Sequence, residues 1–289
     1  LGSIVVLVGI LCLVYRAKTL LGAPTFAYAE LLQVPLSGTE QLWLFGAFAL
    51  AFSVKIPVFP LHTWLPDAHV EAPTPGSVIL AAVLLKIGTY GFLRFLLPLF
   101  PVAAQHPVVV NTMLVLAVIG IIYTACVAAV QSDAKKLVAY TSVAHMGFVV
   151  LGIFALNVNG LQGGLVVMIS HGISTGALFL LLGMLSERRH TREIEEFGGI
   201  ARVAPWFATA FVVTALASIG LPGTSGFVGE FLVLLGAFED HKGLALTATL
   251  GVILSAYYML PMVQRIFFNP LEKQENREIR DLSKREIVI

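Results

Sequence analysis

The hydrophobic pattern of the chain consists of long apolar runs separated by short polar connections. The longest stretch without Asp, Glu, Lys or Arg, 137–186, is divided by Asn157, Asn159 and Gly160, residues that favour turns. A membrane-spanning helix needs about 20 mostly apolar residues. The pattern therefore predicts an all-α polytopic membrane protein with about eight spans. The predicted spans are 1–15, 41–60, 76–97, 107–130, 135–156, 161–185, 203–238 and 243–268.

Two polar segments lie outside these spans, the connection 187–202 and the tail 269–289. The tail ends on Ile287, Val288 and Ile289, which indicates the start of a further span. If the spans alternate in direction, one side holds twelve basic connection residues and the other holds four. Because Lys and Arg are enriched in cytoplasmic loops, we predict a cytoplasmic loop at 187–202 and a polar cytoplasmic tail at 269–289. Residues 1–289 as a whole are predicted to form one transmembrane domain.

The composition supports a membrane protein and excludes several other classes. Hydrophobic residues make up 57% of the chain and charged residues 12%, with a mean hydropathy of +0.89. Soluble domains carry about 25% charged residues, so a soluble enzyme, a disordered chain and a nucleic-acid-binding protein are excluded. Cys12 and Cys126 both lie in apolar runs and indicate neither a disulfide framework nor a metal cluster.

Two of the predicted spans contain helix breakers. The segment 41–60 runs into Pro57, Pro60 and Pro66, and the 36-residue segment 203–238 is interrupted by GLPGTSG at 220–226. Proline removes a backbone donor and clashes with the preceding helical turn. Both spans are therefore predicted to be discontinuous helices. Two interrupted spans in one chain are typical of transporters built from repeats.

A few ionisable residues lie within the apolar runs. They are Lys55 at the first break, Lys86 in the middle of a span, His145, His171, and Glu230 in the run GFVGEFLVLLGAF. Placing a charge at the bilayer centre costs about 2.5–3.5 kcal/mol even on insertion scales, so such residues are retained for function. Buried lysine, glutamate and histidine are groups that exchange protons. We predict that these five residues form a proton path at mid-depth of the bundle.

Simpler interpretations exist for some of these residues. A single histidine in a membrane helix can serve only as a hydrogen-bonded packing residue. His62, Asp67 and His69 are residue types that bind zinc, but prolines separate them and no further cluster supplies four ligands. We therefore expect them to bond the exposed backbone of the loop, and we expect no metal site.

Three long motifs resemble a known family. They are VKIPVFPLHTWLPDAHVEAPTPGSVILAAVLLK at 54–86, DAKKLVAYTSVAHMGFV at 133–149 and GLPGTSGFVGEF at 220–231. The chain resembles the antiporter-like membrane subunits of respiratory complex I and of Mrp-type cation/proton antiporters over nearly its whole length. In that family the position of Glu230 is glutamate in the M-type (chain 4) branch and typically lysine in the L-type, N-type and Mrp branches. The loop ERRHTREIEEFGG at 187–199 is also similar to the M-type branch.

The resemblance implies an inverted-repeat fold with two discontinuous helices, of which this chain would be a fragment of a 14-helix subunit. It implies proton-channel roles for Lys55, Lys86 and Glu230, with His145 and His171 on the axis between them. It also implies that Lys55 pairs with a glutamate on an earlier helix that this sequence does not include.

The function implied is proton translocation within NADH:quinone oxidoreductase, without a redox centre in this chain. No iron–sulfur, haem or nucleotide-binding motif is present in the sequence. NADH, FMN, iron–sulfur clusters and quinone are then expected in partner subunits, and other antiporter-like membrane subunits as neighbours in the bacterial inner membrane. Two alternatives remain open, a subunit of an Mrp-type antiporter and a passive structural membrane subunit.

Overall fold

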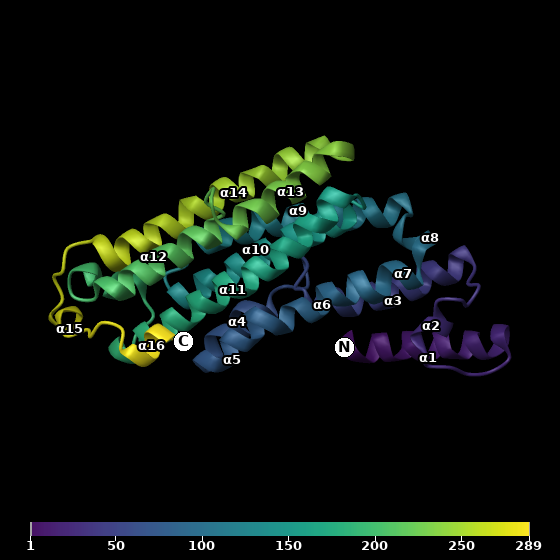
Figure 1. The fold of residues 1–289 in the computed structure, drawn as a ribbon, viewed down its shortest axis with the longest axis horizontal. Helices are drawn as coiled ribbons and strands as arrows, with labels where there is room; N and C mark the ends of the chain where they lie inside the picture. The colour runs from purple at the N-terminus through teal and green to yellow at the C-terminus, as the bar shows by residue number, and fades with distance from the viewer. Residues whose placement is uncertain (1, 289) are drawn as a thin grey trace.

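Long helices that run roughly side by side make up the computed structural model, which describes residues 2–288 (Figure 1). Leu1, the first residue of the predicted span 1–15, and Ile289, the last residue of the predicted tail, lie outside the described residues. Six helical segments are long and apolar enough to cross a membrane. They are Gly2–Leu20, Thr74–Leu99, Pro107–Ala129, Ala134–Phe154, Val158–Arg189 and Lys242–Phe268. The chain is therefore an all-α polytopic membrane protein, as predicted.

The two spans predicted to be discontinuous are each divided between two helices. The first consists of α3 (Gly38–Lys55) and α4 (Trp64–Glu71), and the second of α12 (Pro205–Ile219) and α13 (Ser225–Asp240). None of these four helices is among the six long apolar segments, so the count of eight spans stays a prediction. The breaks themselves lie at the predicted positions.

The remaining helices complete the bundle. The long ones are α1 (Gly2–Leu21), α9 (Pro107–Ala129), α10 (Ala134–Phe154), α11 (Val158–Arg189) and α14 (Lys242–Val263). The segment 74–99 contains α5 (Thr74–Ile79), α6 (Leu85–Gly91) and α7 (Leu97–Leu99), joined by π-helical turns at Leu80–Leu84 and Phe92–Leu96. Short helices are α2 (Tyr28–Leu31), α8 (Pro101–Ala104), α15 (Gln274–Arg277) and α16 (Lys284–Val288).

Side chains at the helix starts explain several boundaries. The Asp133 carboxylate accepts from the backbone N–H groups of Lys135 and Lys136 and so begins α10. The Asn157 side chain accepts from the Gly160 N–H at 2.8 Å and begins α11. Helix α11 continues to Arg189, so the first residues of the loop predicted at 187–202 are helical, which corrects that boundary.

Helix α10 lies at the centre of the bundle. In the most apolar stretch of α10, 89% of the residues are buried, whereas in the corresponding stretch of α1 only 22% are buried. It packs against α4, α9, α11 and α13, and α11 in turn packs along α13. The central position of α10 brings residues from these helices toward one another.

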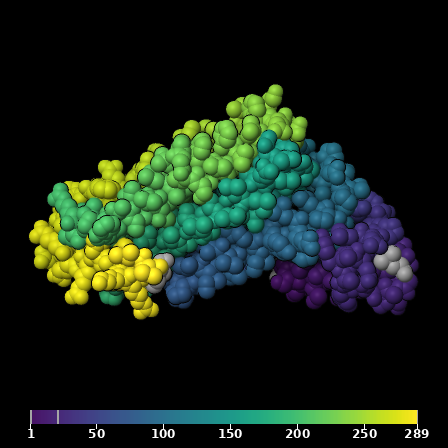
Figure 2. Space-filling view, in the orientation of Figure 1, coloured from purple at the N-terminus to yellow at the C-terminus, as the bar shows by residue number. Residues whose placement is uncertain are grey.

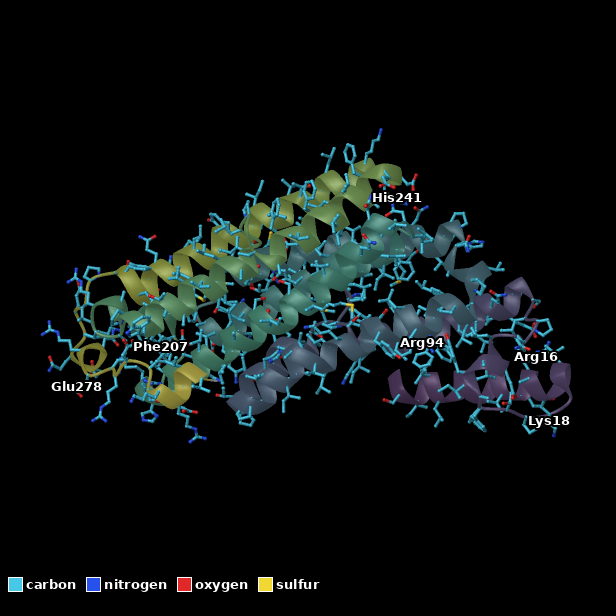
Figure 3. All side chains as sticks on the ribbon, in the orientation of Figure 1. Arg16, Lys18, Arg94, Phe207, His241 and Glu278 are labelled. Carbon is cyan, nitrogen blue, oxygen red and sulfur yellow. The ribbon has the colours of Figure 1, made fainter. Side chains whose placement is uncertain are left out.

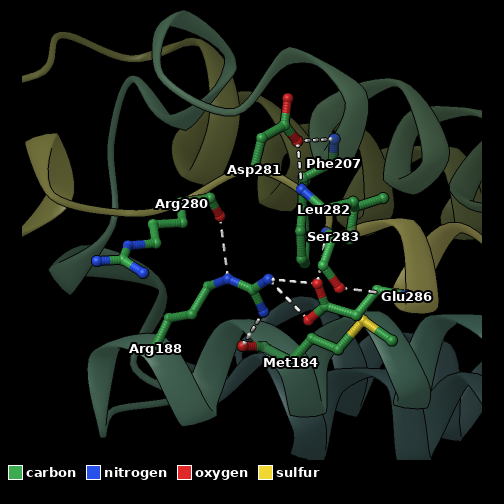
Figure 4. Close-up of polar contacts among 8 residues, drawn as sticks. All are labelled: Met184, Arg188, Phe207, Arg280, Asp281, Leu282, Ser283 and Glu286. Atoms are coloured by element: carbon green, nitrogen blue, oxygen red, sulfur yellow. Dashed lines mark hydrogen bonds and ion pairs between the residues drawn. The ribbon is translucent and has the colours of Figure 1, made fainter.

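The predicted polar tail folds back over the end of α11 and the start of α12 (Figure 4). Arg188 donates to both Glu286 carboxylate oxygens at 2.7 and 2.9 Å and to the Arg280 carbonyl oxygen at 3.0 Å. The Asp281 carboxylate accepts from the Trp206 and Phe207 N–H groups at the start of α12. These bonds tie the tail to the first half of the second discontinuous helix.

Charged side chains gather at the ends of the long axis, as Figure 3 shows with Glu278 at one end and Arg16 and Lys18 at the other. The tail, in yellow in Figure 2, lies at the first of these ends, opposite the purple N-terminal segment. At the tail end a hydrogen bond from Lys273 holds the pKa of Glu196 below its usual range. His145, His171 and Glu230 are buried inside the bundle.

Candidate functional site

Four of the five ionisable residues singled out from the sequence lie in one row through the bundle. The row runs from Lys86 on α6 to His171 on α11, His145 on α10 and Glu230 on α13. His145, His171 and Glu230 are buried, and Lys86 is partly buried. Each residue comes from a different helix, so the row depends on how these helices pack.

The local backbone explains the position of Lys86. The π-helical turn Leu80–Leu84 directly precedes its helix, and the Leu85 N–H bonds the Leu80 carbonyl five residues back. Such turns are frequent at functional sites. The Lys86 ammonium donates at 2.6 Å to the carbonyl oxygen of Ala81. A Cβ on Gly172 would lie 3.1 Å from the Ala82 carbonyl oxygen, so the glycine lets α11 approach the π-helical turn that precedes Lys86.

Lys86 and His171 form a short contact, with 2.6 Å between Nζ and Nδ1. An ammonium group only donates, so a charged Lys86 requires His171 to accept at Nδ1 and to carry its proton at Nε2. This Nε2 is buried and has no hydrogen-bond partner among residues 2–288. The next ring in the row, that of His145, lies 5.5 Å away between ring centroids.

His145 faces oxygen atoms on both sides of its ring. Nδ1 lies 2.9 Å from the Thr141 carbonyl oxygen, and Nε2 lies 2.9 Å from the Ser218 carbonyl oxygen and 3.3 Å from Glu230 Oε1. Carbonyl and carboxylate oxygens only accept, and a neutral imidazole has a single N–H. Only a doubly protonated ring can therefore donate on both sides at once.

The break between α12 and α13 supplies part of this environment. Because the last carbonyl groups of a helix lack intrahelical partners, the Ser218 carbonyl at the end of α12 is free to accept from His145. Gly220 follows with φ of +77°, and a Cβ there would lie 2.8 Å from Glu230 Oε2. Glycine is thus needed at this position both for the left-handed backbone and for the approach of the carboxylate.

Close packing of α11 on α13 holds Glu230 in place. A Cβ on Gly163 would lie 2.5 Å from the Val233 backbone nitrogen, and one on Gly229 would lie 2.8 Å from the Val167 backbone nitrogen. The two backbones approach one another only because these residues have no side chains. Glu230 directly follows Gly229, so this contact sets its distance from α10.

Lys55 is the one predicted residue that the structure leaves outside the row. It is the last residue of α3 and is half-buried at the first break. Within the described part of the chain, its ammonium group makes neither a hydrogen bond nor an ion pair. The break beside it is stabilised by the Trp64 indole N–H, which donates to the Val54 carbonyl at 2.9 Å.

His62, Asp67 and His69 do not converge on a common point. The ring of His62 stacks on Phe59, Asp67 forms a 3.8 Å ion pair with Lys136, and His69 stacks on Phe179. Over residues 2–288, no group of three or more His, Cys, Asp or Glu residues could hold a metal ion. The zinc interpretation of this motif has no geometric support.

The ring of His69 does not bond the loop backbone, contrary to the expectation from the sequence. It is fully buried, and its two ring nitrogens have no partner among the described residues. Lys135 donates to the Ala72 carbonyl at 2.7 Å and borders a cavity of about 190 Å³, which Thr74, Ser186 and Arg192 also line. His69 and the cavity-lining Lys135 lie on α4 and α10, two helices that pack against one another.

Comparison with known proteins identifies a family and relatives of this chain. Residues 1–255 match the model of the family described as NADH:quinone oxidoreductase/Mrp antiporter, transmembrane. The NADH-quinone oxidoreductase subunit M of Rhodobacter capsulatus is 49% identical over 296 residues, covering 100% of this chain and 57% of that protein. The chain thus spans little more than half the length of this relative.

Solved structures show the same fold. A chain of respiratory complex I from Thermus thermophilus with bound NADH aligns with a TM-score of 0.90 at 40% identity, over 99% of this chain and 61% of that one. A chain of the Mrp complex from Dietzia aligns with a TM-score of 0.81 at 23% identity, over 93% of this chain and 49% of that one, which shows the fold alone. The chain belongs to the NADH:quinone oxidoreductase/Mrp antiporter family of membrane proteins.

Proposed function

We propose that this chain is part of a proton-translocating membrane subunit of NADH:quinone oxidoreductase, and that protons pass along Lys86, His171, His145 and Glu230. The observation that carries the proposal is the row itself, which links four helices. Lys86 lies 2.6 Å from His171, the rings of His171 and His145 are 5.5 Å apart between centroids, and His145 lies 3.3 Å from Glu230.

The chemistry of the row suits stepwise proton transfer. Lysine can donate to His171 Nδ1, and an imidazole that gains a proton on one nitrogen can release one from the other. His145 first passes a proton from Nε2 to Glu230 Oε1, 3.3 Å away, beside the helix break. The neutral ring that remains can accept the His171 Nε2 proton, which faces no fixed acceptor among residues 2–288. Lys55, which lies outside the row, is proposed to modulate these steps through a change of ionic partner.

Protons taken up from the cytoplasmic side are proposed to pass through the cavity at Lys135 and then to His69. His69→Phe keeps an aromatic ring against Phe179 but removes both ring nitrogens, so proton uptake into the row is expected to slow by about 10²-fold or more. His69→Gln keeps a hydrogen-bonding group and is expected to retain part of the rate. The rate of proton uptake by vesicles that contain the assembled enzyme is compared among the parent and the two His69 variants. Equal rates for parent and His69→Phe enzymes would exclude the route.

The redox chemistry is proposed to occur in partner subunits. NADH, FMN, iron–sulfur clusters and quinone would be bound there, and neighbouring antiporter-like membrane subunits would transmit the energy to this chain. The relative from Rhodobacter is a subunit of such an enzyme, which favours this assignment and a position in the bacterial inner membrane. On this proposal the chain conducts protons and carries no redox centre.

Glu230 favours this function over an Mrp-type antiporter. The family resemblance associates glutamate at this position with the quinone-reductase branch, and the relative at 49% identity belongs to that branch. A passive structural subunit is disfavoured by the Lys86–His171 contact, since packing alone does not require a lysine in a membrane helix.

Glu230→Gln tests the proposed function. Glutamine has nearly the same shape but does not take up a proton, so the number of protons translocated per electron pair is expected to fall. Electron transfer from NADH to a soluble artificial acceptor is expected to continue at the parent rate. Glu239→Gln, on the same helix but at its exposed end, is the matched control and should leave the ratio unchanged. An unaltered ratio in Glu230→Gln would contradict the proposal.

A further inference from the structure

One face of α11 runs from the 190 Å³ cavity to the row of ionisable side chains. Five residues lie on this face, in the order Ser186, Leu182, Phe179, Thr175 and His171. In a helix with 3.6 residues per turn, these positions fall within an arc of about 80°. The first two residues also line the cavity. The face is therefore a continuous stripe that leads from the cavity to His171.

His69 lies against this stripe. Its ring stacks on Phe179, with 4.3 Å between the ring centroids and 11° between the ring planes. Side chains of an α-helix lean toward its N-terminus, so the Phe179 ring covers the turn that carries Thr175. Thr175 is in turn a neighbour of His171, because residues four apart on a helix are about 5–6 Å apart at Cβ. Along α11, Thr175 is thus the residue between the His69–Phe179 stack and His171.

The Thr175 hydroxyl group is fully buried and has no hydrogen-bond partner among residues 2–288. Other hydroxyl groups inside the helices bond a carbonyl oxygen one turn back. The adjacent Ser174 donates to the Ser170 carbonyl at 2.9 Å, and Thr141 donates to the Leu137 carbonyl at 3.0 Å. Buried polar groups in native proteins are almost always paired. The Thr175 hydroxyl is therefore available for a partner other than its own backbone.

The two histidines on either side of Thr175 also have unpaired nitrogens. Over the described part of the chain, His171 Nε2 and both ring nitrogens of His69 are buried without a partner. Two helical turns, about 12 Å, separate His171 from the phenylalanine on which His69 stacks. Proton transfer requires a hydrogen bond of about 2.6–3.2 Å. Because a hydroxyl group both accepts and donates, it can connect two groups that are too far apart to bond directly.

We propose that the Thr175 hydroxyl relays protons from His69 to His171. Once His171 has passed its Nε2 proton to His145 and has taken the Lys86 proton at Nδ1, its Nε2 has a free lone pair. The Thr175 hydroxyl donates its proton to this Nε2 and takes a replacement from His69. His171 then returns the Nδ1 proton to Lys86, so the net transfer is one proton from His69 into the row. This inference rests on the proposed function, because it connects the uptake route with the row.

Thr175→Val in the assembled enzyme tests the relay, because valine keeps the branched shape and lacks the hydroxyl. The rate of proton uptake by vesicles is expected to fall by about 10²-fold or more. Thr175→Ser restores the hydroxyl and is expected to bring the rate close to that of the parent. Ser174→Ala is the matched control, since it removes a neighbouring buried hydroxyl that bonds its own helix. It should leave the rate unchanged.

The relay also predicts that His69 and Thr175 act in series, so adding Thr175→Val to His69→Phe slows uptake no further. A parental rate in Thr175→Val overturns the inference, and so does a Thr175→Ser variant as slow as Thr175→Val. If the valine variant does not assemble, Thr175→Cys replaces it. The thiol is a weak donor, so its rate is expected to fall below that of Thr175→Ser, and a parental rate again overturns the inference. The proposed function fails instead if Glu230→Gln leaves the proton ratio unchanged.

Discussion

Lys86→Met is expected to lower the number of protons translocated per electron pair in the assembled enzyme. Methionine matches lysine in length but donates no proton, so the bonds to His171 Nδ1 and to the Ala81 carbonyl are both lost. Removing a positioned proton donor slows transfer by about 10²-fold or more, which closes this path on the time scale of turnover. Vesicles that oxidise NADH provide the measurement, with acidification and electron flux recorded together.

Electron transfer to a soluble artificial acceptor is expected to stay at the parent rate in Lys86→Met, because the proposed redox centres lie in other subunits. Lys18→Met provides the control, since Lys18 is exposed near the end of α1. It removes the same charge far from the row and should leave the proton ratio unaltered. A parental ratio in Lys86→Met would show that Lys86 has only a structural role.

Gly163→Ala is expected to reduce both the stability of the protein and its proton coupling. The new Cβ would lie 2.5 Å from the Val233 backbone nitrogen and 2.9 Å from the Gly229 carbonyl oxygen. Because these are backbone atoms, α13 has to move away from α11, at a cost of about 1–3 kcal/mol. Glu230 moves with α13 and loses its 3.3 Å contact with His145. Thermal inactivation of the assembled enzyme and the proton ratio report the two effects.

Gly46→Ala is the matched control for this substitution. Gly46 lies inside α3, and a Cβ there would meet no atom within 4 Å. Alanine favours a helix interior over glycine by about 1 kcal/mol, so this variant is expected to be as stable as the parent or slightly more stable. If Gly163→Ala behaved like Gly46→Ala, close packing of α11 on α13 would not be what places Glu230.

The sequence was sufficient to identify the residues of the row because ionisable side chains are rare in apolar runs. Lys86, His145, His171 and Glu230 stand out on this basis alone, and the structure brings all four together. The two helix breaks were likewise visible as clusters of proline and glycine. The order of the row was not predictable, since it depends on which helices are neighbours.

Other parts of the site left no distinct signal in the sequence. The Ser218 carbonyl belongs to the backbone and becomes an acceptor only because α12 ends there. His69 lies in a proline-containing motif that indicated a loop, and its burial against Phe179 follows from tertiary packing. The tail was predicted only to be polar and cytoplasmic, and the sequence did not indicate that Arg188 and Asp281 attach it to the bundle. Each of these outcomes depends on contacts between distant segments.

The most direct test of the central claim, that one continuous path joins Lys86 to Glu230, is the proton ratio of the Lys86→Met/Glu230→Gln double variant. Both single variants are measured beside it in the same vesicles. If the two residues act in series, blocking either one closes the path, so the double variant is predicted to show the same ratio as each single variant. A double variant whose ratio falls by the sum of the two single losses would contradict the account, because the residues would then serve separate paths.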